Sequence, residues 1–184
     1  KGFKMTNGVQ STTMADIDLA GLQSAPQAST YFNLGANLNA AATSASTFSS
    51  PITLYSSVGS TITLNIAWTK VAGSNKWTFA ASPSLGSITA GASGSVSFDT
   101  NGQLSLKDGS AAADHTFTLD FSSADPPANE MTLNWDLVDS SGATHGKLTG
   151  FAADSNNNAM IQDGFTTGTL LGLSVDQKGI INGL

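Results

Sequence analysis

The sequence has no cysteine and no arginine among its 184 residues, and only 11% of the residues are charged. Without cysteine no disulfide can form, and a domain of this size can fold without one. Arginine is the side chain that most often binds phosphate and guanine edges in bidentate fashion, so its absence argues against nucleic-acid binding. The net charge of −6 argues in the same way against anionic membrane surfaces. We therefore expect neither nucleic acid nor a membrane among the partners of this chain.

Long apolar runs are also missing. No run approaches the ~18 apolar residues that a transmembrane helix needs, and no basic start followed by an apolar stretch indicates a cleaved signal peptide. The chain is nevertheless 40% hydrophobic, and Val, Ile, Leu, Phe and Trp recur in register. Disordered chains lack that composition, so this sequence should fold.

Alternation of apolar and polar residues is the main pattern in the sequence. The apolar members of the alternating runs are Phe32, Leu34, Ala36 and Leu38; Ile62, Leu64, Ile66 and Trp68; Trp77 and Phe79; Phe117, Leu119 and Phe121; and Met131, Leu133, Trp135 and Leu137. Short alternating strands every ~8 to 12 residues, with hardly a helical period, predict an all-β sandwich or barrel. Alternation further favours mostly antiparallel sheets with one solvated face. The three tryptophans have inward parity, so we expect core packing rather than sugar stacking.

Turn and loop signals separate the predicted strands. In "DTNG", Asn101 and Gly102 tolerate the positive φ that a hairpin turn requires. The polar stretch 153–159, "ADSNNNA", is predicted to be a loop. Near the end we expect a strand through Leu171, Leu173 and Val175, a turn at "DQKG", and a second short strand.

Few residues offer chemistry. His115 and His145 are the two histidines; His115 shares the inward parity of its strand and His145 lies in a turn, so structural or solvent-exposed roles are expected. "GASGS" lacks the last glycine of a nucleophile elbow. Two aspartates of the glycosidase type could still meet in space, but no pair is singled out.

A metal loop is also weakly indicated. Asp154, Asn156 and Asn158 imitate the first ligands of a calcium loop, but Ala159 and Phe165 occupy the positions that need Gly and Glu. We therefore predict no catalytic, cofactor-binding or metal residues and no cofactor. The subunit interface is not identified by the sequence.

The polar faces of the predicted strands are rich in Thr and Asn and poor in charge. A soluble monomer gains from surface charge, whereas a face of hydroxyl and amide groups costs less to bury against copies of the same chain. Extracellular β proteins that do not assemble often have this composition as well. On composition alone both interpretations stay open.

Four segments in order carry a resemblance to a known family. They are 29–40 "STYFNLGANLNA", 54–79 "LYSSVGSTITLNIAWTKVAGSNKWTF", 96–104 "VSFDTNGQL" and 163–184 "DGFTTGTLLGLSVDQKGIINGL". Together they resemble bacterial flagellar hook proteins. Residues 54–79 point to the hook, although Ser56 and Ser60 stand where that family usually has Asp and Asn. The last segment is shared with rod and other axial proteins, and 129–159 has no clear counterpart in shorter hook proteins.

The resemblance implies two β-sandwich or barrel-like domains, the outer one inserted into the inner one. The inner domain would comprise residues 1–28 plus 160–184, and the outer domain residues 29–159. The terminal helices of the family are missing, so the chain would be the outer part of a subunit and monomeric by itself.

The implied function is that of a structural subunit of the hook, a self-assembling flexible tube that transmits torque from motor to filament. Its partners would be copies of itself, with rod and hook-associated proteins at the ends. The implied location is extracellular, after export without a cleaved signal peptide.

Two alternatives are kept. Within the same class, the chain would be a flagellar rod or hook-associated protein, although the large inserted domain argues against the rod. From another class, it would be a secreted carbohydrate-binding or adhesive β-sandwich, which needs exposed aromatic residues or a genuine calcium loop. An enzyme ranks last, because no polar cluster stands out.

Overall fold

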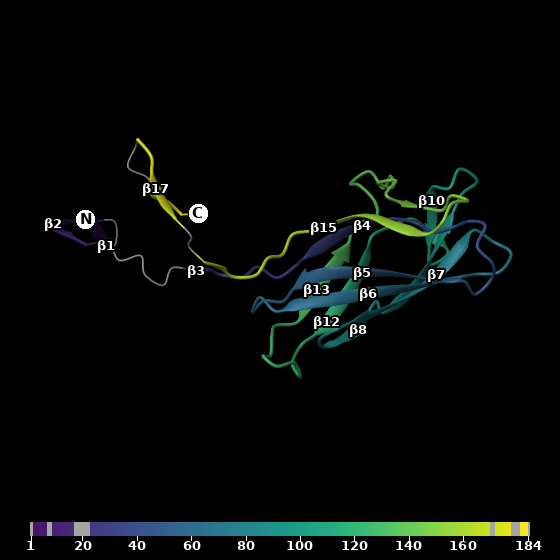
Figure 1. Ribbon diagram of the computed structural model, residues 1–184, viewed down its shortest axis with the longest axis horizontal. Helices are drawn as coiled ribbons and strands as arrows, with labels where there is room; N and C mark the ends of the chain where they lie inside the picture. The colour runs from purple at the N-terminus through teal and green to yellow at the C-terminus, as the bar shows by residue number, and fades with distance from the viewer. Residues whose placement is uncertain (1, 7–8, 17–22, 170–171, 178–180, 184) are drawn as a thin grey trace. The chain divides into compact units, whose positions relative to one another are not determined.

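Figure 1 shows the computed structural model of the chain, which describes residues 2–6, 9–16, 23–169, 172–177 and 181–183. The regular elements in this part of the chain are all β-strands, which confirms the predicted class, and it contains no helix long and apolar enough to cross a membrane. Two compact units are formed, one by residues 1–25 with 168–184 and the other by residues 26–167. The domain bounds expected from the sequence, 1–28 with 160–184 and 29–159, stay a prediction.

The unit formed by residues 1–25 with 168–184 contains short antiparallel strand pairs. Its strands pair as β1 (Gly2–Thr6) with β2 (Val9–Ala15), β3 (Gln23–Ser24) with β16 (Gly168–Thr169), and β17 (Leu173–Val175) with β18 (Ile181–Gly183). The last pair confirms the two short strands predicted near the end of the sequence. Leu171 and residues 178–180 of the predicted turn lie outside the described residues.

The unit formed by residues 26–167 contains two larger sheets. The first, called the β6 sheet here, is antiparallel throughout and has the order β11-β10-β9-β7-β6-β5. Its strands are β5 (Thr47–Tyr55), β6 (Thr61–Lys70), β7 (Lys76–Pro83), β9 (Ser93–Phe98), β10 (Leu104–Lys107) and β11 (Ser110–Ala111). The predicted hairpin between Thr61 and Phe79 is therefore confirmed, with Trp68 paired to Phe79 across it.

The second sheet, called the β4 sheet here, has the order β14-β4-β13-β12-β8, and β15 also pairs with β4. Its strands are β4 (Tyr31–Asn37), β8 (Ser87–Ala90), β12 (His115–Asp120), β13 (Met131–Trp135), β14 (Leu148–Thr149) and β15 (Asn156–Gln162). Strand β4 runs parallel to β13 and β14 and antiparallel to β15. The two parallel pairings are the exceptions to the antiparallel sheet that alternation predicts.

One local prediction is wrong, and another is confirmed only in part. The predicted loop 153–159 is a strand from Asn156 onward, because β15 pairs with β4 along most of its length although asparagine is a poor strand former. The hairpin predicted at "DTNG" is confirmed, since β9 pairs with β10 across it, and Gly102 has a φ of 73°, but Asn101 does not adopt positive φ. Asp99 Oδ1 accepts hydrogen bonds from the backbone N–H groups of Asn101 and Gln103 instead, and this holds the turn with a single left-handed residue.

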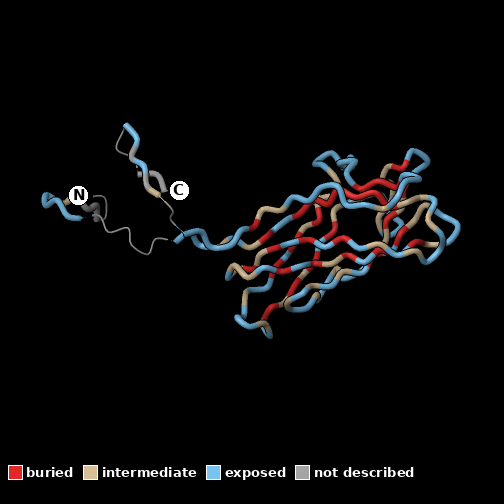
Figure 2. Tube along the Cα trace, in the orientation of Figure 1, coloured by how far each residue is buried: buried red, intermediate tan, exposed pale blue. Residues whose placement is uncertain are grey.

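The β6 and β4 sheets face each other across one apolar core (Figure 2). The ring of Trp68 on β6 lies 5.8 Å from that of Trp135 on β13, and Phe79 on β7 lies 6.5 Å from Phe117 on β12. Trp68, Trp77 and Trp135 are at most 1% exposed, which confirms their predicted core packing. Each buries about 150–250 Å², or about 5 kcal/mol of favourable transfer free energy as an upper estimate.

Candidate functional site

His115 is a core residue. It is 8% exposed at the start of β12, and its ring centroid lies 4.7 Å from that of Phe117 and 5.1 Å from that of Phe79. Nε2 lies 2.8 Å from the carbonyl oxygen of Gly91, so it must carry the proton and donate. Burial lowers the pKa of His115. The predicted position on the inward face is confirmed, and the imidazole is held by packing.

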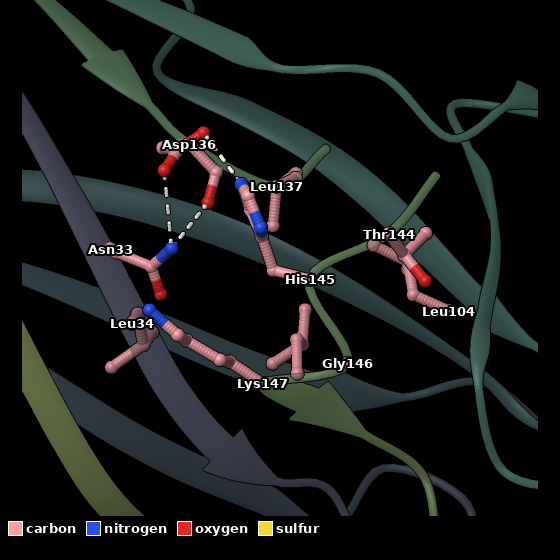
Figure 3. A pocket seen from close by; sticks show the side chains of 10 residues that line it. Asn33, Leu34, Leu104, Asp136, Leu137, Thr144, His145, Gly146 and Lys147 are labelled. Carbon is pink, nitrogen blue, oxygen red and sulfur yellow. Dashed lines mark hydrogen bonds and ion pairs between the residues drawn. The ribbon is translucent and has the colours of Figure 1, made fainter. Parts of the chain in front are cut away.

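His145 lies between β13 and β14, next to the small hollow shown in Figure 3. Its Nε2 is 3.0 Å from Asp136 Oδ1, and Asn33 Nδ2 donates to Asp136 Oδ2 at 3.3 Å and to the Asp136 carbonyl at 3.1 Å. The hollow has about 10 Å³ of free volume, which is room for at most one water molecule. Small-molecule sites span about 300–1,000 Å³, so this polar group cannot enclose a substrate.

A wider depression lies around the ring of Phe151, near Asn75 and Gly102, with about 420 Å³ of volume. The carboxylate there, Asp99, already accepts two backbone hydrogen bonds. The Asn75 side chain donates to the Gly150 carbonyl at 3.0 Å. The polar groups at this depression therefore hold the local backbone and do not converge on a reacting atom.

Several carboxylates accept backbone hydrogen bonds, and Asp114 is one that is partly buried. Asp114 accepts from Leu137 N at 2.9 Å, from Val138 N at 3.0 Å and from Asn134 Nδ2 at 2.9 Å. Burial raises the pKa of Asp114, but these hydrogen bonds lower it more, so the net pKa is below the ordinary value. The geometry is that of an ionised acceptor that fixes the loop after β13.

Asp163 plays the same part at the start of β4. It accepts from Thr30 N at 2.8 Å, from Thr30 Oγ1 at 2.5 Å and from Tyr31 N at 3.2 Å. Burial raises its pKa and the hydrogen bonds from Thr30 and Tyr31 outweigh that effect, which leaves the pKa of Asp163 lowered.

The polar face of β4 is buried, which the alternation pattern does not predict. Asn37 is 6% exposed; its Oδ1 accepts from Phe151 N at 2.9 Å and from Thr149 Oγ1 at 3.1 Å, and its Nδ2 donates to the Ala153 carbonyl at 2.9 Å. A side chain at Gly35 would collide with Asn158 Oδ1 and would come within 3.0 Å of the Ala159 Cβ. The sequence signal for this face is the alternating amide residues within "NLGANLN". A strand whose polar face is exposed to solvent can have the same pattern, so the sequence alone does not reveal the burial.

The candidate calcium ligands are not gathered in a loop. Asn156 and Asn158 lie in β15, and the Nδ2 of Asn156 donates to the Asp154 carbonyl at 3.0 Å. Within the described residues no group of three His, Asp or Glu side chains could hold a metal ion.

Comparison with known protein families gives a match over most of the chain. Residues 20–165 match the family described as the flagellar basal body protein FlaE D2 domain. This match confirms the resemblance to flagellar hook proteins that the sequence segments carry. A comparison with curated protein sequences gives no match.

Several solved structures are similar to this chain, including two of flagellar hook proteins. One is a 32 kDa fragment of the flagellar hook protein FlgE from Caulobacter crescentus, with 19% sequence identity and a TM-score of 0.51, covering 63% of this chain and 46% of that chain. The other is the flagellar hook protein FlgE2 of Helicobacter pylori, with 15% identity and a TM-score of 0.45, covering 74% of this chain and 31% of that chain. At 19% identity, the similarity to the Caulobacter crescentus fragment shows a shared fold and nothing further. This chain spans less than half the length of either protein.

Proposed function

We propose that this chain, which belongs to the flagellar basal body protein FlaE D2 domain family, is part of a structural subunit of the bacterial flagellar hook. The observation that carries the proposal is the family match over residues 20–165. The first and last parts of the chain, 1–28 and 160–184, would form an inner domain, and residues 29–159 an outer domain inserted into it. Gln27 and Phe165 exchange backbone hydrogen bonds of 2.9 and 3.0 Å, so the incoming and outgoing segments run side by side, as an inserted domain requires.

In this proposal the subunit associates with copies of itself in a helical tube. A contact that repeats without closing generates a filament. The tube bends while it rotates, so its subunit contacts slide or reform in each turn. Surfaces with few charges suit such contacts, because no desolvated ion pair has to be broken. The chain by itself is expected to be a monomer, and rod and hook-associated proteins would bind at the ends of the tube.

The proposal places the protein outside the cell, in the flagellum, after export without a cleaved signal peptide. It includes no enzymatic activity, cofactor, metal, nucleic acid or membrane. Two observations support the proposal that the chain has no enzymatic activity: His115 is buried in the core, and the hollow at His145 is too small for a substrate. The alternative of an adhesive or carbohydrate-binding sandwich loses its tryptophans as stacking surfaces, because all three are buried.

Immunogold electron microscopy on intact cells tests the proposal. Antibodies raised against the chain should place gold on a short curved segment between the cell body and the filament. Serum absorbed with the purified chain, and cells from which the gene has been deleted, are the controls. Gold scattered over the cell surface would refute the hook assignment and favour the adhesive sandwich.

A further inference from the structure

One face of the β6 sheet is exposed and carries no charged side chain along β5, β6 and most of β7; Lys76, half-buried at the start of β7, lies at its margin. This face is formed by the odd-numbered residues of 47–53 and 61–69 and the even-numbered residues of 78–82, and we call it the hydroxyl face. Six of its twelve residues are threonine and two are serine; the rest are two alanines, Pro51 and Asn65. Eleven of the twelve are exposed, and Asn65 is half-buried. Along these strands the exposed residues of the hydroxyl face alternate with buried residues of the core, and Figure 2 shows them as pale blue and red segments in turn.

The side chains of the hydroxyl face are aligned across the strands. Thr47 pairs with Thr69, and Thr69 pairs with Thr78, so three threonines form one row; Thr53 and Thr63 form another pair. No large side chain projects from these rows. A surface that approaches this face therefore meets neither a knob nor a pocket that would fix a single register.

Charge is segregated within the unit formed by residues 26–167. Residues 19–98 contain no aspartate or glutamate, and their charged residues are Lys70, which is buried, and Lys76, which is half-buried. Residues 99–167 contain ten carboxylates and two lysines. On the opposite sheet, Asp120 ends β12 and Glu130 and Asp136 flank β13.

This distribution of charge favours a second copy of the chain as the partner of the hydroxyl face. A partner of strong charge, of either sign, gains nothing from a neutral face, because steering and specificity come from complementary charge. Two copies of this acidic chain repel each other wherever carboxylates meet. The hydroxyl face is a surface that a second copy can approach without that repulsion.

The area of the hydroxyl face limits the strength of any contact that a second copy makes with it. Three strands about 4.8 Å apart, each about 27 Å long, give a face of about 400 Å². A stable complex buries about 800 Å² per partner. The contact is therefore too small to hold two free chains together, and it becomes populated only where a tube already holds the copies close.

We propose that the hydroxyl face is the surface on which the outer parts of neighbouring subunits contact and slide past one another, each face meeting a different surface of the next copy. This inference rests on the proposed function, because it needs the tube. The heterologous contact follows from helical assembly, since an isologous contact would close a dimer.

Thiol labelling tests the contact directly, because the chain has no cysteine of its own. Thr69→Cys places a thiol on the hydroxyl face, and Ser140→Cys places one in an exposed turn as the matched control. Maleimide labelling is measured on the isolated chain and on purified hooks that contain the full-length protein. We expect both thiols to react in the isolated chain, and the ratio of the Thr69→Cys rate to the Ser140→Cys rate to fall strongly in hooks. An unchanged ratio would overturn the inference.

Charge substitution tests whether the contact matters for the tube. The pair Thr63→Asp and Thr69→Asp adds two carboxylates to the hydroxyl face, and Thr116→Asp with Thr132→Asp adds two to the exposed face of the opposite sheet. Urea unfolding of the isolated chains first establishes that all variants fold. The first pair should straighten or shorten hooks and reduce swimming more than the second pair.

Equal effects of the two pairs, or normal hooks from the first pair, would refute the role of this face. A failure of the proposed function is distinguishable, because immunogold would then find the wild-type protein outside the hook, and the inference would fall with it. If the wild-type protein lies in the hook and the labelling ratio does not change, only the inference fails.

Discussion

Replacing Asn37 with alanine should destabilise the protein far more than an ordinary substitution of a polar strand residue. Asn37 lies on β4, and its amide joins the end of that strand to the segment after β14. Its Oδ1 accepts from Phe151 N and Thr149 Oγ1, and its Nδ2 donates to the Ala153 carbonyl. Alanine leaves the N–H of Phe151 and the carbonyl of Ala153 without this partner.

The magnitude follows from the number of groups left unpaired. Each buried polar group without a partner costs about 1–3 kcal/mol, and water at the exposed ring of Phe151 keeps the sum toward the lower end. We expect a loss of about 2–4 kcal/mol in the free energy of unfolding, or about 5–15 °C in Tm for a domain of this size. An Asn37→Asp variant should lose at least as much at neutral pH, because a carboxylate would face the Ala153 carbonyl, and part of the loss should return at acidic pH.

Urea unfolding followed by tryptophan fluorescence measures this effect, because all three tryptophans are buried in the folded unit. The matched control is Asn156→Ala, which removes one exposed hydrogen bond to the Asp154 carbonyl and should change stability by less than about 0.5 kcal/mol. If Asn37→Ala unfolds at the same urea concentration as Asn156→Ala, the amide does not hold this segment and the reasoning is wrong.

Three further predictions concern the core and its turns. Because burial lowers the pKa of His115 below 6.5, His115 takes up a proton more readily in the unfolded chain than in the folded one as the pH falls. The contribution of His115 to stability should therefore be complete above pH 6.5 and decline below it. Urea midpoints measured from pH 7.5 to 5 should show this decline in the wild type and not in a His115→Phe variant. At Gly86, with a φ of 76°, an added Cβ would lie 2.5 Å from the Asp120 carbonyl oxygen, whereas at Gly73, with a φ of 66°, it would meet nothing within 4 Å. Gly73→Ala should therefore cost about 1–2 kcal/mol in the free energy of unfolding and Gly86→Ala clearly more, and equal urea midpoints would contradict the clash. Ser50→Ala removes the acceptor 3.0 Å from the indole Nε1 of Trp68 and should cost about 1–3 kcal/mol, with a shift in tryptophan emission that a mere surface change would not give.

The strands that carry the core could be predicted from the sequence, because their apolar residues repeat with a period of two. Phe32, Trp68 and Leu133 are each fully buried, as their parity indicates. In these strands the local pattern and the tertiary structure agree. The sequence also indicates the family, through segments spread over most of the chain.

The strand β15 could not be predicted, because its sequence contains three consecutive asparagines and every residue but Gln162 is exposed. It is a strand because β4 offers a free edge along its length, and such an edge exists only after the β4 sheet has formed. The burial of Asn37 has the same origin. Its partners at 149–153 are more than 100 residues away in the sequence, so no local pattern reports them.

The way this fold is held together explains why its charge can be placed so unevenly. The polar groups at the ends of β4 are satisfied by neutral amides and by carboxylates that accept backbone N–H groups, as at Asn37 and Asp163. In the described part of the chain, the ion pairs Lys107–Asp108 and His145–Asp136 are both partly exposed, and such pairs contribute about 0–1 kcal/mol each. Stability therefore does not require charges on the β6 sheet. A stretch of 80 residues without a carboxylate, in a chain with thirteen acidic residues, is therefore not imposed by the fold, and it agrees with the role that we propose for the hydroxyl face.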